Sequence, residues 1–184
     1  DGNYIIITVE TFSEDELDMK MEQLDTLCEA NGAVDVLEAD DRVWKVRRNC
    51  QESLRVISPV SITDDVVVPV DKVADCIKFV EEHGKKYPFK VLTLAHAGDG
   101  NFHTLLLYDG KDPKEVEKVE AFVERLVHRA IAMDGTCTGE HGVGQGKAAY
   151  MDEEVGPALD TMRAIKTALD PQNIFNPGKI FPQD

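Results

Sequence analysis

The chain has 184 residues and a mass of 20.4 kDa, enough for one sizeable domain, and its hydrophobic content of 42% is typical of a globular protein. Its 35 acidic residues against 20 Lys and Arg give a net charge of -15, which argues against nucleic acid or an anionic membrane as a partner, because phosphate binding requires a basic surface. No apolar run approaches the roughly 20 residues of a membrane span, and four widely spaced cysteines without a CxxC pair favour a reducing, cytoplasmic location.

The first part of the chain predicts two strand and helix pairs. Residues 4–9, with the sequence YIIITV, are β-branched and aromatic, which favours a strand. Ser13 and Glu16 have the spacing of a capping box, which predicts that a helix begins there. Residues 34–37 indicate a short second strand, and residues 40–54 indicate a second helix.

The middle of the chain predicts a further strand and helix, followed by a hairpin. Residues 66–70, VVVPV, predict a strand that ends at Pro69, after which Asp71 can cap a helix. Within residues 91–108, two strand-like runs surround the sequence Gly-Asp-Gly. Because Asp-Gly adopts positive φ at low cost, these residues predict a β-hairpin.

The last third of the chain combines helices with a glycine-rich loop. Residues 113–133 carry the apolar stripe of an amphipathic helix. The loop GTCTGEHGVGQGK follows at 135–147, then a final helix to about Ala168, and then the tail DPQNIFNPGKIF at 170–181. Repeats and low-complexity stretches are absent from the sequence.

The order of these elements predicts the fold class. Strands and helices alternate, but two consecutive strands form a hairpin, which favours an α+β fold with an antiparallel sheet covered by helices over a doubly wound parallel sheet. A ferredoxin-like arrangement fits this order best. We assign residues 1–150 to one domain with the candidate site and residues 151–184 to a C-terminal helix and tail.

The stretch HAGDGNFH places His96 and His103 symmetrically about the predicted turn. With Asp99 and Gly100 as the central residues of a type I′ turn, the two histidines would lie directly opposite each other on neighbouring strands. Directly opposed Cβ atoms are roughly 4.5–5.5 Å apart, so two imidazole nitrogens can converge on one metal ion. The alternative is a pair of histidines that simply lines a wet sheet edge.

The glycine-rich loop supplies two more candidates, Glu140 and His141, which are adjacent and which we expect to point in different directions. Together with His96 and His103, Glu140 would form a two-His, one-carboxylate set with open coordination positions. Such a set is expected of a catalytic rather than a structural metal. His141 would remain free as a base.

The other two histidines carry less information. His83 follows two glutamates near the end of a helix, and His128 lies on the polar side of an amphipathic helix. We expect both to be surface residues.

The sequence GVGQGK at 142–147 does not match the motifs that bind nucleotide phosphates. The dinucleotide-binding pattern requires glycine where Lys147 stands, and the P-loop requires Ser or Thr where Ala148 stands. A flexible loop whose glycines let another surface approach explains it as well as an anion site does.

Three motifs together resemble, in order and spacing, the C-terminal region of FAD-linked oxidases, the family of flavoenzymes that includes D-lactate dehydrogenase, glycolate oxidase and D-2-hydroxyglutarate dehydrogenase. They are HAGDGNFH at 96–103, GEHGVG at 139–144 and DPQNIFNPGK at 170–179. Val43-Trp44 followed by Arg47, and the later DDVVVP, also look like this family's cap or substrate domain. The resemblance covers nearly the whole chain.

The resemblance implies an enzyme that oxidises a 2-hydroxy acid to the 2-oxo acid and passes a hydride to FAD. It implies that His96, His103 and Glu140 hold a divalent metal, with zinc as the first choice and iron or manganese as alternatives. The ion would bind the substrate's hydroxyl and carboxylate and lower the pKa of the hydroxyl. His141 would take that proton as the general base.

The resemblance also implies roles outside the metal set. Arg47 would pair with the substrate carboxylate, with Arg48 as the fallback, because guanidinium binds carboxylate in a bidentate manner. Asn176 would lie near the flavin. Residues 1–150 would be the cap domain, and residues 151–184 would pack toward the FAD-binding domain.

In this family the FAD-binding domain precedes the region that the chain resembles. The chain opens on Asp-Gly-Asn without an initiator Met, so we expect a piece of a longer protein that binds no FAD and is inactive alone. Further expected partners are the 2-hydroxy-acid substrate and an electron-acceptor protein.

The alternative functions are a metallohydrolase with the same two-His, one-Glu site, or a non-catalytic interaction domain. A hydrolase gives the motif IFNPGK no role, and the intact histidines argue against a vestigial site.

Overall fold

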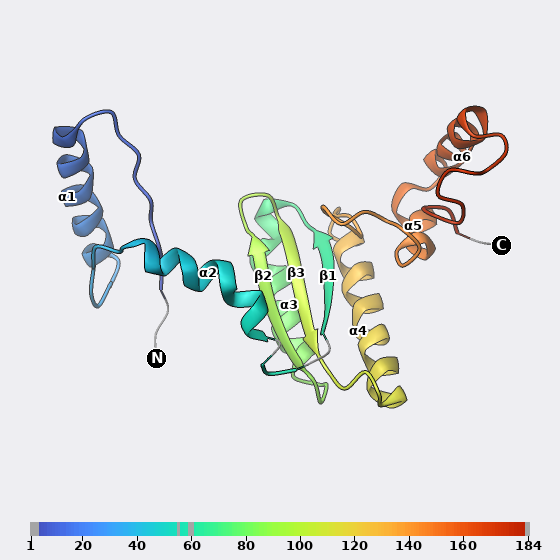
Figure 1. Cartoon of the computed structure of the whole chain (residues 1–184), viewed down its shortest axis with the longest axis horizontal. Helices are drawn as coiled ribbons and strands as arrows, with labels where there is room; N and C mark the ends of the chain where they lie inside the picture. The colour runs from blue at the N-terminus through green and yellow to red at the C-terminus, as the bar shows by residue number, and fades with distance from the viewer. Residues whose placement is uncertain (1–3, 55, 59–60, 183–184) are drawn as a thin grey trace. The chain divides into compact units, whose positions relative to one another are not determined.

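The computed structural model describes residues 4–54, 56–58 and 61–182 (Figure 1). The chain divides into two compact units, residues 1–50 and residues 51–184, and each is described by itself. Among the described residues, no helix is both long and apolar enough to cross a membrane.

The first unit contains helix α1 (Glu14–Ala30) and most of helix α2 (Asp41–Leu54). Ser13 caps α1, because its Oγ accepts a hydrogen bond from the backbone N–H of Glu16 at 3.2 Å. The carboxylate of Glu16 accepts one in turn from the backbone N–H of Phe12 at 3.3 Å. The predicted helix start is confirmed, although the return bond of the capping box goes to Phe12 rather than to Ser13.

The two strands predicted in this unit are absent, and both predictions are wrong: residues 4–9 and 34–37 form no strand. Tyr4 and Ile5 are 87% and 86% exposed. A strand is stabilised by hydrogen bonds to a neighbouring strand, and none of the described strands pairs with either stretch. High β-propensity measures the fit of a side chain to a pleated, half-buried surface, so without a partner it does not make a strand.

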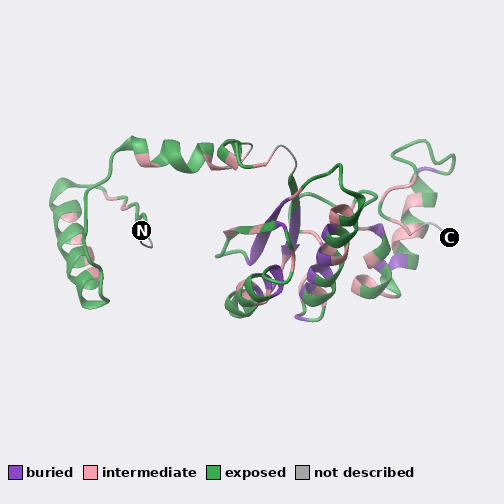
Figure 2. Cartoon of the chain, turned by 90° about the horizontal axis from the view of Figure 1, so that it is seen from below, coloured by how far each residue is buried: buried purple, intermediate pink, exposed green. Residues whose placement is uncertain are grey.

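The second unit is built on a sheet of three described strands: β1 (Ser61–Val67), β2 (Lys90–His96) and β3 (Asn101–Leu107). Their order is β1-β3-β2, and both neighbouring pairs are antiparallel. Every residue of the central strand β3 is buried. Helices α3 (Val73–Gly84) and α4 (Pro113–Ile131) cover one face of the sheet (Figure 2).

The hydrophobic core lies between the sheet and these two helices. Phe102 and Leu106 of β3 and Phe122 and Leu126 of α4 are fully buried and belong to one cluster. Because successive side chains of a strand point to opposite faces, His103 lies on the face away from the helices. The sheet therefore separates the apolar core from the candidate ligands.

The α+β class and the antiparallel sheet are confirmed. The order β1-α3-β2-β3-α4 follows the first five elements of the ferredoxin-like β-α-β-β-α-β arrangement. In place of a last strand, an isolated bridge joins Thr136 to Val67, with nitrogen-to-oxygen distances of 2.9 and 3.1 Å. The described part of the chain therefore lacks the fourth strand of a ferredoxin-like sheet.

Two boundaries between β1 and α3 differ from the prediction. The strand predicted over 66–70 begins earlier, at Ser61, and ends at Val67. Asp71 does not cap α3: it lies in the 3-10 helix η1 (Val70–Lys72), and α3 begins directly after it without a side-chain cap.

The predicted final helix is divided in two. After the 3-10 helix η2 (Ala148–Tyr150), α5 (Met151–Val155) and α6 (Ala158–Leu169) are separated by Gly156-Pro157. Gly156 has a φ of 50°, and proline has no N–H to continue the helical ladder, so the helix stops and restarts.

The tail after α6 is fixed by Asp170. Its carboxylate accepts hydrogen bonds from the backbone N–H groups of Ile174 and Phe175 at 3.0 and 2.9 Å, and it pairs with Lys166. The lysine partner, together with these N–H donors, lowers the pKa of Asp170. Further along, the N–H of Ile180 donates to the carbonyl of Gly144 at 2.7 Å, so the tail contacts the glycine-rich loop.

Candidate metal centre

The hairpin that carries the two histidines has a four-residue loop, so the predicted two-residue type I′ turn is wrong. His96 pairs with Asn101, and His103 pairs with Leu94. Residues 97–100 form the turn. The two histidines are therefore not directly opposite each other.

The turn is determined by packing at Gly100. This residue has a φ of 72°, and a Cβ there would lie 1.9 Å from the carbonyl oxygen of Val68. Its own carbonyl accepts a hydrogen bond from the N–H of Val68 at 3.0 Å. Only glycine fits this close approach of two backbones, and the contact holds the loop against the end of β1.

The histidines nevertheless meet, as diagonal neighbours. His96 is two residues beyond Leu94, the partner of His103, so both imidazoles lie on one face of the sheet. Their ring centroids are 5.4 Å apart, and the rings are perpendicular. The predicted convergence is present, although the register that produces it differs.

Glu140 completes the predicted set. Its Oε1 lies 3.0 Å from Nε2 of His103. One ligand atom from each of His96, His103 and Glu140 can be chosen so that all three lie within 4.8 Å of one another. His103 is buried, whereas His96 and Glu140 are exposed. Two imidazoles and a carboxylate are a donor set found in zinc, iron and manganese sites.

His141 faces the same cluster, contrary to the expectation that it and Glu140 point in different directions. Its ring stacks on that of His103 with centroids 5.2 Å apart. Its Nε2 lies 3.7 Å from Oε1 of Glu140, and its Nδ1 lies 3.9 Å from Oδ2 of Asp65. Asp65, His103 and His141 form a second group with metal-ligand spacing.

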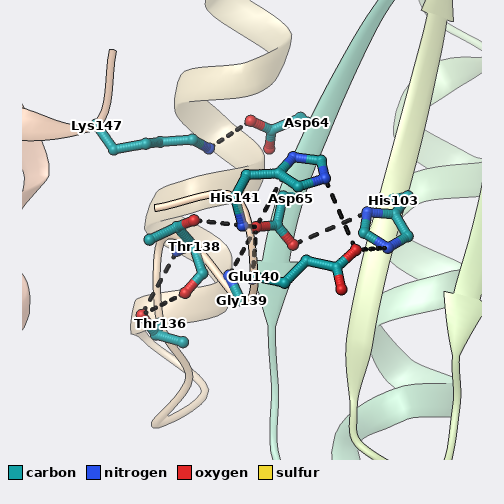
Figure 3. Close-up of polar contacts among 9 residues, drawn as sticks. All are labelled: Asp64, Asp65, His103, Thr136, Thr138, Gly139, Glu140, His141 and Lys147. Carbon is teal, nitrogen blue, oxygen red and sulfur yellow. Dashed lines mark hydrogen bonds and ion pairs between the residues drawn. The ribbon is translucent and has the colours of Figure 1, made fainter. Parts of the chain in front are cut away.

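Asp65 of β1 holds the loop that carries Glu140 and His141 (Figure 3). Its Oδ2 accepts four hydrogen bonds: from Oγ1 of Thr138 at 3.0 Å, and from the backbone N–H groups of Gly139, Glu140 and His141 at 2.9 Å each. A single buried oxygen thus fixes the backbone on which both side chains stand.

The charge of Asp65 is stabilised by this arrangement. Burial raises the pKa of its carboxyl, but the hydrogen bonds that it accepts from the loop outweigh burial and lower the pKa below its ordinary value. Asp65 is missing from the candidates proposed from the sequence. The available signal is two consecutive acidic residues, Asp64-Asp65, within a β-branched run, where strand propensity disfavours them.

The neighbouring Asp64 holds the other end of the loop. Successive strand residues face opposite sides of the sheet, so Asp64 points away from Asp65, and it forms a buried ion pair with Nζ of Lys147. Burial raises the pKa of Asp64, and the Lys147 charge opposes that shift. The loop is thus anchored to both faces of β1.

The glycines of the loop have different roles. A Cβ on Gly139 would lie 2.6 Å from Cγ2 of Val67 and 2.8 Å from Oδ1 of Asn101, so this position requires glycine for close packing. A Cβ on Gly142, Gly144 or Gly146 would have no atom within 4 Å among those described. The second half of the loop is therefore open on the surface.

Glu154 of α5 supports the start of the loop. Its carboxylate accepts hydrogen bonds from Oγ1 of Thr136 at 2.5 Å and from the N–H of Cys137 at 2.7 Å. Burial raises the pKa of Glu154, but these hydrogen bonds lower it overall. The 3-10 and α-helical segment after the loop therefore contributes to its placement.

The remaining predicted site residues belong to other elements of the chain. Arg47 and Arg48 are exposed on the part of α2 that belongs to the first unit, and Asn176 is exposed in the tail, with a φ of 45°. Their assigned roles stay predictions.

Of the two histidines expected on the surface, only His128 is exposed. Its Nδ1 lies 2.6 Å from the carboxylate of Glu153. The prediction for His83 is wrong. His83 is buried, because its ring stacks between Phe79 of the same helix and Phe122 of α4.

The fold and the site define an α+β domain with a two-His, one-carboxylate cluster, in which both histidines lie on strands of the sheet and the carboxylate lies on a loop. Residues 1–180 match the family "FAD linked oxidases, C-terminal domain", and the chain belongs to this family. The resemblance seen in the three sequence motifs is therefore confirmed.

The curated relatives agree with this assignment. The chain is 41% identical over 159 residues to "Probable D-lactate dehydrogenase, mitochondrial" of Danio rerio, a match over 82% of this chain and 32% of the relative. It is 36% identical over 170 residues to "Glycolate oxidase subunit GlcD" of Bacillus subtilis, over 89% of this chain and 36% of the relative. The chain thus spans about a third of the length of these relatives.

Proposed function

We propose that the chain is the substrate- and metal-binding C-terminal domain of an FAD-dependent 2-hydroxy-acid dehydrogenase of the D-lactate or glycolate type. The whole enzyme would oxidise its substrate to the 2-oxo acid with hydride transfer to flavin. The observation that carries the proposal is the convergence of His96, His103 and Glu140, within 4.8 Å of one another, in a member of the FAD-linked oxidases.

The residues of this cluster fit a divalent metal ion. Two imidazoles and one carboxylate leave coordination positions open for a substrate. Zinc is our first choice, and iron and manganese accept the same donor types. When bound, such an ion lowers the pKa of a coordinated hydroxyl group.

His141 would take the proton of the substrate hydroxyl at its Nε2. Its ring stacks on His103, and its side chain is 47% exposed, so the imidazole borders the cluster and remains accessible. Imidazole is the group most often used for this step. FAD, when bound, accepts the hydride that leaves the substrate carbon.

Arg47 would bind the substrate carboxylate, with Arg48 as the fallback, because guanidinium offers two parallel donors to a carboxylate. Asn176 would lie near the flavin. Both arginines are exposed in the first unit, and Asn176 is exposed in the tail, so each side chain is available for a ligand.

Residues 151–184 would pack toward the FAD-binding domain of the same protein. Leu169, Ile174 and Phe175 are 77%, 64% and 64% exposed, and exposed apolar side chains gathered in one segment support a contact surface there. An electron-acceptor protein would complete the catalytic cycle. A cytoplasmic location also stays a prediction.

Membership of the FAD-linked oxidases favours this proposal over the two alternatives. A metallohydrolase would use the same metal ligands to activate water and would need no flavin. An interaction domain would need neither a metal nor His141.

A pair of substitutions in the full-length protein, with its FAD-binding domain, tests the assigned roles. His103→Ala removes the buried ligand, so we expect loss of stoichiometric metal, measured by elemental analysis. His141→Ala leaves the three ligands in place, so we expect metal to remain while substrate-driven flavin reduction slows roughly 10²–10⁴-fold, as for loss of a general base.

His128→Ala is the matched control, because His128 is an exposed histidine on α4, away from the cluster, and its loss should change neither quantity. Stoichiometric metal in the His103→Ala protein would remove the ligand assignment. Unchanged flavin reduction in the His141→Ala protein would remove the base.

The 184-residue chain by itself should bind no FAD. Its loop sequence GVGQGK at 142–147 matches neither the dinucleotide-binding pattern nor the P-loop pattern. The purified chain should therefore lack the visible absorbance of flavin, with or without added FAD. A flavin band that survives desalting would contradict this expectation.

A further inference from the structure

Two buried polar atoms face each other next to the candidate ligands. Oδ1 of Asp65 and Nδ1 of His103 are 3.9 Å apart (Figure 3), on neighbouring strands β1 and β3 that pair these two residues directly. Neither atom has a hydrogen-bond partner among the described residues. An unsatisfied buried polar atom costs roughly 1–3 kcal/mol, so a small approach that joins the two would remove both penalties.

The two oxygens of Asp65 have separate environments. Oδ2 accepts all four hydrogen bonds from the loop, which leaves no room on it for another donor. Oδ1 has no hydrogen-bond partner in the described part of the chain and lies 3.9 Å from Nδ1 of His103. The carboxylate therefore cannot rotate to exchange its oxygens without breaking the bonds to the loop.

We propose that Asp65 is a positioning residue that fixes His103 as the Nδ1–H tautomer and so directs the lone pair of Nε2 at the metal position. Nε2 lies 3.0 Å from Oε1 of Glu140, on the side where the candidate ligands converge. A carboxylate that accepts the second N–H of a metal-binding histidine fixes both its tautomer and its ring orientation. The inference rests on the proposed ligand set.

The same residue thus couples two parts of the site. Through Oδ2 it holds the backbone of Glu140 and His141, and through Oδ1 it orients His103. In the alternative, Asp65 itself binds the ion together with His103 and His141, and the ligand atoms of these three residues also lie close enough together to share one ion. If Oδ2 bound the metal, it would have to release one of its hydrogen bonds to the loop. Otherwise Oδ1 of Asp65 and Nδ1 of His103 would have to bind the metal instead.

The tautomer of His103 in the wild-type chain is the first measurement. Long-range ¹H–¹⁵N NMR of the metal-free chain distinguishes Nδ1–H from Nε2–H. We expect Nδ1–H. An Nε2–H tautomer of His103 would overturn the proposal.

Asp65→Asn then separates positioning from support of the fold. Four donors converge on one atom of residue 65, so the amide oxygen must occupy that place, and the amide NH₂ must face Nδ1 of His103. The loop keeps its acceptor, but His103 now has to accept at Nδ1 and carry its proton on Nε2. We expect the tautomer to invert while the NMR dispersion of the rest of the chain is retained.

Zinc binding by calorimetry provides the second readout. We expect Asp65→Asn to weaken zinc affinity roughly 10–100-fold, the usual effect of losing such a partner. The control Asp71→Asn removes the same charge from an exposed position in η1 and should bind zinc as the wild type does. In the zinc-loaded wild type, the ion should be on Nε2 of His103.

The outcomes separate this inference from the proposed function. A wild-type chain that binds no zinc contradicts the proposed metal site, whereas the metal-free tautomers still decide the role of Asp65. Zinc on Nδ1 of His103, or an Asp65→Asn chain with the wild-type tautomer and affinity, overturns the positioning role. If Asp65→Asn fails to fold, the wild-type tautomer and the zinc-bound nitrogen decide alone.

Discussion

His83 is a buried histidine in an aromatic cluster on α3. Its ring stacks between Phe79 and Phe122 with centroid distances of 5.2 and 5.5 Å, and its Nε2 lies 3.2 Å from the hydroxyl of Tyr87. Burial lowers the pKa of His83, and the nearby charges of Lys86 and Arg125 lower it further. Both of these groups are positively charged, which penalises a protonated imidazole.

This environment predicts a dependence of stability on pH. Because the pKa of His83 is lower in the folded than in the unfolded chain, the unfolded chain binds more protons below about pH 6.5. The contribution of His83 is therefore complete above that pH and is lost as the pH falls through its folded pKa, with a slope of at most about 1.4 kcal/mol per pH unit. Urea unfolding at about pH 7 and about pH 5 should show a larger loss of stability in the wild type than in His83→Leu.

Tyr87→Phe is the control for this comparison, because it removes the hydroxyl but leaves His83 buried. It should retain the wild-type change between the two pH values, since burial is the main cause of the lowered pKa. Equal changes in the wild type and in His83→Leu would show that other groups carry the acid sensitivity.

The error over His83 has a specific cause. The two preceding glutamates suggested solvent, but Cys76, Val80 and His83 follow one another at intervals of four and three residues and form the buried stripe of α3. The helical period was therefore more informative than the immediate neighbours. Asp65 is not predicted for a different reason: the groups that donate hydrogen bonds to it are 73 to 76 residues away in the sequence.

At the scale of elements, two long helices lie within two residues of their predicted bounds. The helix predicted over 113–133 spans Pro113–Ile131, and the one predicted over 40–54 spans Asp41–Leu54. The hairpin was also predicted, but its register was not. Gly-Asp-Gly is compatible with several turn types, and the contact of Gly100 with Val68, which selects one of them, is tertiary.

The three candidate ligands could still be found from the sequence. His96 and His103 remain on the same face under both registers, because the predicted and observed partners of His103 differ by two residues. A shift by one residue would have placed them on opposite faces. By contrast, strand formation at residues 4–9 depends on a partner strand, which local propensity does not supply.

At the scale of the whole molecule, burial differs sharply between elements, and this predicts a graded hydrogen exchange of the 184-residue chain. No residue of α1 is buried, whereas all seven residues of β3 are. Amides of β3 should exchange only through global unfolding, which costs about 5–15 kcal/mol in small domains, whereas those of α1 should exchange through local opening at far lower cost.

Helix α4 is the internal control, because it is similar in length to α1 but has five buried residues, and its amides should exchange as slowly as those of β3. Protection of α1 equal to that of α4, measured by mass spectrometry, would show that another surface covers α1 in solution.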